Sequence, residues 1–118
     1  MGQTAGDKPD AVDLEILRGA TVGDRDIMQE LASLYLSDTD LQLRALGDAL
    51  QNKEADRLKR IGASLTTASQ GIGAEPAAAI FHELEEAAKA GDFDRVARAI
   101  EEGRAEFARV QKALADLR

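Results

Sequence analysis

The last quarter of the chain carries the pattern that most constrains its fold. From residue 93 to residue 117, apolar or small residues recur at alternating steps of three and four: Phe93, Val96, Ile100, Gly103, Phe107, Val110, Leu114 and Leu117. This spacing turns one side of a helix toward neighbouring helices along its whole length. Gly103 lies in this row, where the lack of a side chain lets a neighbouring backbone come close. We therefore predict a long C-terminal helix that packs in the core of a helical protein.

The rest of the chain predicts four more helices, because it has helical periodicity and no alternating strand pattern. The expected helices run from the Asp13 cap to about Gly19–Thr21, from Gly23 and Asp24 to about Asn52, from near Glu54 to a stop at Gly71 and Gly73, from the turn containing Pro76 to just before Gly91, and from the Asp92 cap to the C-terminus. Short connections favour antiparallel neighbours. We predict an all-α protein, an up-down antiparallel four-helix bundle with a short extra N-terminal helix. Residues 1–10 are expected to form a flexible tail, and residues 11–118 the single domain.

The long second helix carries two leucines that its main apolar stripe does not include. The stripe that we expect in the core consists of Ile27, Met28, Leu31, Leu34, Tyr35, Leu46, Ala49 and Leu50. On an ideal helical wheel, Leu36 and Leu43 fall about 110–130° away from it, seven residues apart. Either the short first helix covers this pair with Leu14 and Leu17, or part of the pair stays exposed and contributes to a docking surface.

The third helix combines a clear core face with an unusual outer face. Leu58, Ile61, Leu65 and Ile72 set the core direction. The side chains that point away from it are Asp56, Lys59, Arg60, Ala63, Thr67 and Gln70. Ala63 is near the middle of this face, one turn after two basic residues. Alanine there is explained either by its helix propensity or by a flat surface that a partner contacts.

Composition and motifs exclude most catalytic and metal chemistry. The chain has no cysteine and one histidine, and its net charge of -7 argues against nucleic acid or an anionic membrane as a partner. A bundle-type metal site needs Glu-x-x-His pairs, and the residue three before His82 is Ala79. His82 itself is expected on the surface among glutamates. We expect no metal, no cofactor, no enzymatic activity and no transmembrane or signal segment, in a cytoplasmic monomer.

Residues 54–74, E-A-D-R-L-K-R-I-G-A-S-L-T-T-A-S-Q-G-I-G-A, resemble the active helix of histidine phosphotransfer (HPt) domains. That helix reads much like A-L-R-R-L-A-H-S-L-K-G-S-S-A-N-L-G-A. The similarity continues on both sides, from the opening residues 12–17 to the closing residues 106–110. The resemblance implies a four-helix bundle. It also implies a role in bacterial two-component signalling, where one exposed histidine relays a phosphoryl group between receiver-domain aspartates.

The sequence departs from this family at the family's most diagnostic positions. The phosphorylated histidine of the H-x-x-K-G motif aligns with Ala63, the lysine with Thr66 and the glycine with Thr67. Without an imidazole at position 63, the motif has no phosphoryl acceptor, and a threonine or serine phosphoester does not readily return its phosphoryl group to an aspartate. An engineered His-to-Ala change would explain Ala63 but neither threonine.

The resemblance leaves three hypotheses. The first is a pseudo-phosphotransfer module that docks a receiver or histidine-kinase domain without accepting phosphate. Its binding surface would include Lys59, Arg60, Ala63, Thr66, Thr67 and Gln70, extended by Leu36 and Leu43. The second is an active phosphotransfer protein in its parental form, with Ala63 as an engineered knock-out. The third is a structural or oligomerisation bundle without a phosphorelay role.

Overall fold

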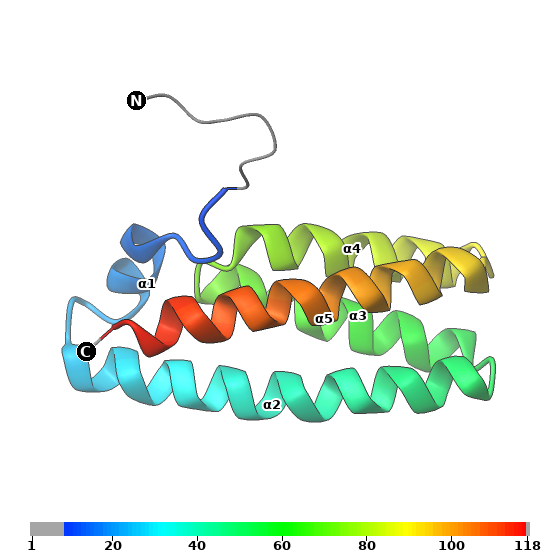
Figure 1. The fold of residues 1–118 in the computed structure, drawn as a ribbon, viewed down its shortest axis with the longest axis horizontal. Coiled ribbons are helices and arrows are strands. Elements are labelled where there is room, and N and C mark those ends of the chain that lie inside the picture. Colours follow the sequence, from blue (N-terminus) through cyan, green and yellow to red (C-terminus); the bar gives the residue numbers. More distant parts are fainter. Residues whose placement is uncertain (1–8, 118) are drawn as a thin grey trace.

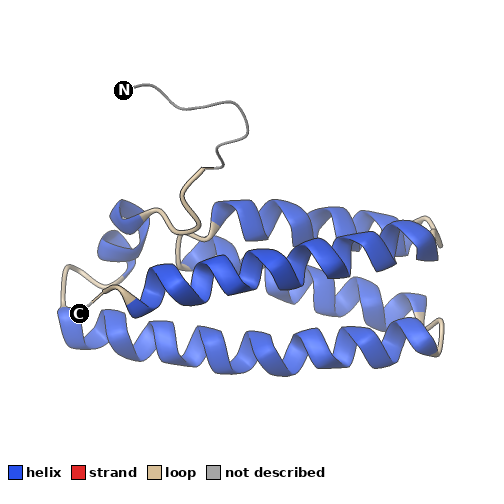
Figure 2. Cartoon of the chain, viewed as in Figure 1, coloured by secondary structure: helices blue, strands red, loops and turns tan. Residues whose placement is uncertain are grey.

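The computed structural model describes residues 9–117, and these residues form five helices and no strand (Figure 2). The helices are α1 (Leu14–Ala20), α2 (Arg25–Gln51), α3 (Ala55–Gly71), α4 (Glu75–Lys89) and α5 (Phe93–Ala115). Each begins within one or two residues of its predicted start, and the all-α prediction is confirmed. The expected flexible tail, residues 1–10, lies outside the described residues except for Pro9 and Asp10, which are exposed.

Aspartate caps fix where three of the helices begin. The side chains of Asp13, Asp24 and Asp92 accept hydrogen bonds from backbone N–H groups in the first turns of α1, α2 and α5. These bonds satisfy donors that have no partner inside the helix. Pro76 lies in the first turn of α4, where its missing N–H costs no helical hydrogen bond. The helix starts therefore follow from local chemistry that is visible in the sequence.

The four long helices run side by side along the longest axis of the molecule, and α1 lies at one end (Figure 1). Contacts link α2 to α3, α3 to α4, α4 to α5, and α5 back to α2. The space between them is filled mainly by leucine, alanine and valine, with Phe81 fully buried. The predicted row on α5 is confirmed as core, because Val96, Ile100, Gly103, Phe107, Val110 and Leu114 are all buried.

Two glycines are required by close contacts. Gly73, in the connection between α3 and α4, has a φ of +81°, and a Cβ there would lie 2.5 Å from the carbonyl oxygen of Asp13. Its own carbonyl accepts a hydrogen bond from the Asp13 N–H at 2.8 Å, which ties α1 to this end of the molecule. A Cβ on Gly103 would lie 2.8 Å from the Phe81 ring. Gly103 therefore makes room for an aromatic side chain of α4.

The predicted core face of α2 needs correction. Ile27 and Leu34 were expected inside, but they are 48% and 63% exposed. The buried residues of α2 are Ala32, Tyr35, Thr39, Leu43, Leu46 and Ala49. Because α2 packs on both α3 and α5, its buried face is rotated away from the stripe that hydropathy alone defined.

This rotation also decides the position of Leu36 and Leu43. Leu43 is 5% exposed, and Leu36 is half-buried. Leu36 lines a shallow groove with Leu114 of α5 and with Leu117 just beyond the end of that helix, so the C-terminal segment rather than α1 is its neighbour. Leu43 is buried and cannot contribute to an exposed strip, whereas Leu36 keeps part of its surface exposed.

Candidate functional site

Part of the predicted outer face of α3 is exposed, and part of it is half-buried next to α4. Leu58, Gly62, Leu65 and Ser69 are buried, which orients the helix. Arg60, Thr67 and Gln70 are exposed, as predicted, whereas Lys59, Ala63 and Thr66 are half-buried. The three half-buried residues lie on the side of α3 that adjoins the contact with α4. The position that matches the family's histidine thus lies beside the contact between α3 and α4.

Gly62 brings α3 and α4 unusually close together. A Cβ on Gly62 would lie 3.1 Å from Cδ2 of Leu84 and 3.2 Å from the backbone nitrogen of Glu85. Only a residue without a side chain allows this approach without displacing the α4 backbone. The chain turns between the two helices at residues 72–74. Gly62 and Glu85 lie at similar distances before and after this turn and contact each other, so α3 and α4 are antiparallel at this contact.

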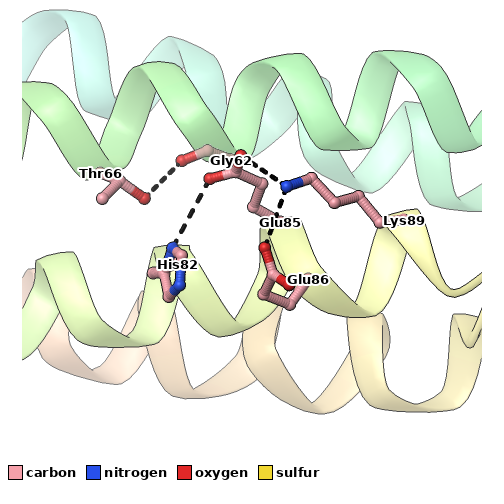
Figure 3. Close-up of polar contacts among 6 residues, drawn as sticks. All are labelled: Gly62, Thr66, His82, Glu85, Glu86 and Lys89. Atoms are coloured by element: carbon pink, nitrogen blue, oxygen red, sulfur yellow. Dashed lines mark hydrogen bonds and ion pairs between the residues drawn. The ribbon is translucent and has the colours of Figure 1, made fainter.

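This contact sets the register between α3 and α4. With a rise of about 1.5 Å per residue, Thr66 lies about 6 Å beyond Gly62, and His82 lies about 4.5 Å beyond Glu85 in the same direction. Thr66 and His82 therefore lie at similar levels on facing helices, as Figure 3 shows. The chain's one histidine, which is distant from Ala63 in sequence, thus lies near the outer face of α3.

Thr66 cannot take over the role of the family's lysine. Its hydroxyl donates a hydrogen bond of 2.8 Å to the carbonyl oxygen of Gly62, one turn earlier in the same helix. This local bond is typical of threonine inside a helix and occupies the hydroxyl proton. Position 66 therefore offers a transferred phosphoryl group neither a positive charge nor a free donor.

A row of charged side chains lies on the side of α4 that adjoins α3. Nδ1 of His82 lies 3.7 Å from Oε1 of Glu85, and Nζ of Lys89 lies 3.7 Å from Oε2 of the same carboxylate. Lys89 also contacts Glu86 at 3.1 Å (Figure 3). The hydrogen bond between Lys89 and Glu86 lowers the pKa of Glu86 and raises the pKa of Lys89. The side chain of Glu85 is only 18% exposed, whereas that of His82 is 61% exposed.

The remaining acidic side chain beside His82 turns to the other side of α4. Glu83 accepts two hydrogen bonds from Arg95 of α5, at 2.9 and 2.7 Å. This pairing raises the pKa of Arg95 and neutralises the carboxylate. The glutamate run therefore splits between two sides of α4, with Glu85 directed to α3 and Glu83 to α5.

The sequence located the α3 half of this site and missed the α4 half. His82 was expected among glutamates on the surface, and its exposure is confirmed. Its proximity to Thr66 could not be read from the sequence, because it depends on the close approach at Gly62. The signal for the α4 wall was the spacing of His82, Glu85 and Lys89, which places all three on one side of a helix.

A buried polar pair anchors α3 to α2 behind the site. The hydroxyls of Tyr35 and Ser69 form a hydrogen bond of 2.8 Å. Burial raises the pKa of Tyr35, partly offset by this bond. Thr39, one turn further along α2, is 1% exposed, and its hydroxyl oxygen has no hydrogen-bond partner. The anchor fixes the rotation of α3 and with it the direction of the outer face.

Exposed apolar side chains form a stripe on α2, next to α3. Ile27, Leu34 and Leu41 are 48%, 63% and 60% exposed, and their spacing places them on one stripe of α2. Leu31 and Leu34 line a groove with Ala68 of α3 and with Ile72, the residue after α3. Of this stripe, Ile27–Leu34–Leu41, the sequence analysis assigned Ile27 and Leu34 to the core. It adjoins the exposed part of α3 on the side opposite α4.

Within residues 9–117, no group of three or more histidine, aspartate or glutamate side chains is arranged to hold a metal ion. None of the five described helices has both the length and the apolarity needed to cross a membrane.

Comparison with solved structures identifies a similar protein. The structure of histidine-containing phosphotransfer protein B from Pseudomonas aeruginosa PAO1 superposes with a TM-score of 0.85 at 29% sequence identity. The match covers 92% of this chain and 94% of that one. No model of a known protein family matches the sequence, and no curated protein matches it. The chain is thus similar, over nearly its whole length, to a histidine-containing phosphotransfer protein, which supports the family resemblance found in its sequence.

Proposed function

We propose that this chain is an HPt-type module of a two-component phosphorelay, which docks a receiver or histidine-kinase domain and cannot accept a phosphoryl group on α3. The observation that carries this proposal is the near-complete structural match to a phosphotransfer protein, combined with alanine at the position of the family's histidine. The proposal includes the family's architecture, an up-down four-helix bundle with a short extra N-terminal helix. The antiparallel contact of α3 with α4 supports it.

The surface of α3 supports docking without chemistry. Lys59 and Arg60 provide positive charge on a protein whose net charge is -7, and an acidic receiver pocket would be attracted to them. Ala63, Thr67 and Gln70 add small or neutral contacts beside them. The exposed stripe of α2 provides apolar area next to this face, which isolated exposed leucines elsewhere would not. We propose these residues, with Thr66, as the partner-binding surface.

The natural pseudo-phosphotransfer form is favoured over an engineered knock-out by Thr66 and Thr67. A single designed substitution leaves the rest of a motif intact, whereas here all three functional positions differ from the family pattern. A purely structural bundle has no need for a basic cluster beside an exposed apolar stripe. We further propose that the protein acts in the cytoplasm as a monomer, as is expected of a module that presents this surface to a partner.

Binding to isolated receiver and histidine-kinase domains from the same genome tests the proposal. We expect at least one such domain to bind in a calorimetric titration. The double variant Lys59→Glu/Arg60→Glu should lose binding, whereas Lys112→Glu/Arg98→Glu, with the same change in charge on exposed positions of α5, should retain it. If no receiver or kinase domain binds, or if both double variants bind equally well, the proposed function or its surface is wrong.

A further inference from the structure

His82 differs from an ordinary surface histidine in its surroundings. Its side chain is 61% exposed, yet Nδ1 lies 3.7 Å from a carboxylate that is itself only 18% exposed. Glu85 is held in place by the close approach of Gly62 and by Lys89 on its other oxygen. At this distance the carboxylate forms no hydrogen bond with the ring, but it attracts a protonated imidazole and favours the orientation in which Nδ1 faces Glu85 and the other nitrogen points away from it. In His82 that free nitrogen is Nε2.

The position of His82 places this nitrogen within a partner's reach. Counted along the antiparallel helices from the contact of Gly62 with Glu85, His82 lies only about 3 Å beyond the level of Ala63. A domain that docks over Ala63 therefore also covers the neighbouring side of α4, where the imidazole is 61% exposed.

The charges around His82 are largely paired. Glu83 forms an ion pair with Arg95 on the other side of α4, and Lys89 lies within 3.7 Å of Glu85 and 3.1 Å of Glu86. Glu85 is the carboxylate next to the ring, where it attracts positive charge on the imidazole. Lys59, three residues before Gly62, adds a cation on the same side of α3, about 9 Å along the helix axis from the level of His82.

We propose that His82 is a phosphoryl-accepting histidine, which takes the group from the aspartyl phosphate of a docked receiver domain. In this step the lone pair of Nε2 attacks phosphorus. The bond from phosphorus to the aspartyl oxygen breaks, and the aspartate leaves as a carboxylate with the bonding electrons. The ring keeps its proton on Nδ1 and becomes a cation that the Glu85 carboxylate stabilises. Glu85 is thus a positioning residue for this transfer. The inference rests on the proposed docking function. It extends that function because the proposal excludes a phosphoryl acceptor on α3 only, and His82 lies on α4.

The first experiment tests the reactivity of His82 without any partner. The protein is incubated with phosphoramidate, a small phosphoryl donor for imidazoles, and phosphohistidine is followed by mass spectrometry and 31P NMR. The matched control is His82→Gln/Gln111→His, which moves the single histidine to an exposed site on α5. We expect His82 to react about tenfold faster than His at the control site and to carry the group on Nε2. Equal rates at the two sites would overturn the proposed activation.

The role of Glu85 has its own readout. In Glu85→Gln, the melting temperature should change little, while the labelling rate falls about tenfold and the product becomes a mixture of Nδ1 and Nε2 isomers. A residue that only supports the fold would not change which nitrogen is phosphorylated. An unchanged isomer ratio would show that Glu85 does not orient the ring.

The second experiment uses a receiver domain that binds in the titration above, labelled with radioactive phosphate on its aspartate. We expect acid-labile label to appear on the protein and to be absent from His82→Gln, whose binding to the same receiver is measured in parallel so that loss of transfer is separated from loss of binding. Binding without transfer would overturn the role of His82 and leave the docking proposal intact. Absence of any binding receiver would count against the docking proposal, and the phosphoramidate comparison would still decide whether His82 is activated.

Discussion

At the scale of single residues, the proposed site is defined by three positions of α3 that align with the family's histidine, lysine and glycine. In the proposed function, Ala63 provides no phosphoryl acceptor, Thr66 provides no positive charge, and Thr67 places a side chain where the family has glycine. The hydrogen bond from the Thr66 hydroxyl to the Gly62 carbonyl oxygen shows that threonine fits at position 66 of the helix. The three changes have separate physical effects and can therefore be reversed separately.

Restoring the acceptor alone should recover little transfer. Ala63→His is expected to fold normally, because position 63 is only half-buried and lies on the outer face of α3. Thr66 and Thr67 still withhold charge and space, so the triple variant Ala63→His/Thr66→Lys/Thr67→Gly should transfer about a hundredfold faster than the single variant. Both are made in a His82→Gln background and assayed with a phosphorylated receiver. Equal rates would mean that Ala63 is the only functional change, as in an engineered knock-out.

Tyr35 should make the protein sensitive to alkali. Burial raises its pKa in the folded state, while an unfolded tyrosine ionises near pH 10. The neutral phenol thus favours folding below about pH 10, and this contribution is lost as pH rises toward the folded pKa. The Tyr35→Phe variant should cost about 1 kcal/mol near neutral pH, through the lost bond to Ser69. Urea unfolding between pH 8 and about pH 11 should show the gap narrowing above pH 10, and a constant gap would contradict this account.

At the scale of helices, the sequence predicted where elements begin and end but not how two of them face their neighbours. The caps at Asp13, Asp24 and Asp92 act within one turn, so their effect is visible in the sequence. The rotation of α2 depends on two partners at once, which a single hydrophobic stripe cannot represent. The pairing of Thr66 with His82 depends on a register set by Gly62. Candidate residues on α3 were therefore predictable, and those on α4 were not.

The corrected rotation of α2 can be tested with two leucines. Leu43→Glu places a charge at a position that is 5% exposed and should destabilise the fold by about 3 kcal/mol or more. Leu34→Glu changes a side chain that is 63% exposed, so its effect on stability should stay within about 0.5 kcal/mol. Leu34→Glu should instead weaken receiver binding, because it interrupts the exposed stripe of α2. If Leu34→Glu lowered the melting temperature and Leu43→Glu did not, Leu34 would lie in the core and Leu43 outside it, as the hydropathy pattern predicted.

Phe107 tests whether the predicted row on α5 holds the core together. It is 7% exposed, and truncation to alanine removes most of the ring from the interior. Phe107→Ala should therefore cost about 3–5 kcal/mol through lost burial and a residual cavity. Ala108→Ser, on the exposed next position, is the matched control and should change stability by less than about 0.5 kcal/mol. A small effect of Phe107→Ala in denaturant unfolding would show that α5 does not pack as described.

At the scale of the whole molecule, charge acts in two opposite ways. The net charge of -7 repels an acidic partner at long range, whereas Lys59 and Arg60 attract it at contact. Salt separates the two effects because screening depends on distance. The Debye length is about 30 Å at 0.01 M and about 10 Å at 0.1 M, so moderate salt removes the repulsion while the contact attraction persists.

The association rate with a receiver of net negative charge should therefore pass through a maximum as salt is increased. It should rise between about 0.01 M and 0.1 M, as repulsion is screened, and fall toward about 1 M, where the Debye length is near 3 Å and the contact attraction is also lost. In Arg60→Glu the falling part should largely disappear, because the local attraction is weakened. Lys112→Glu, which adds the same charge far from α3, should keep the maximum and lower only the rate at low salt. Stopped-flow measurements with the unmodified protein, Arg60→Glu and Lys112→Glu test this prediction. An association rate that falls steadily from the lowest salt concentration would mean that the basic cluster dominates at every distance. The negative charge on the rest of the molecule would then have no effect on docking.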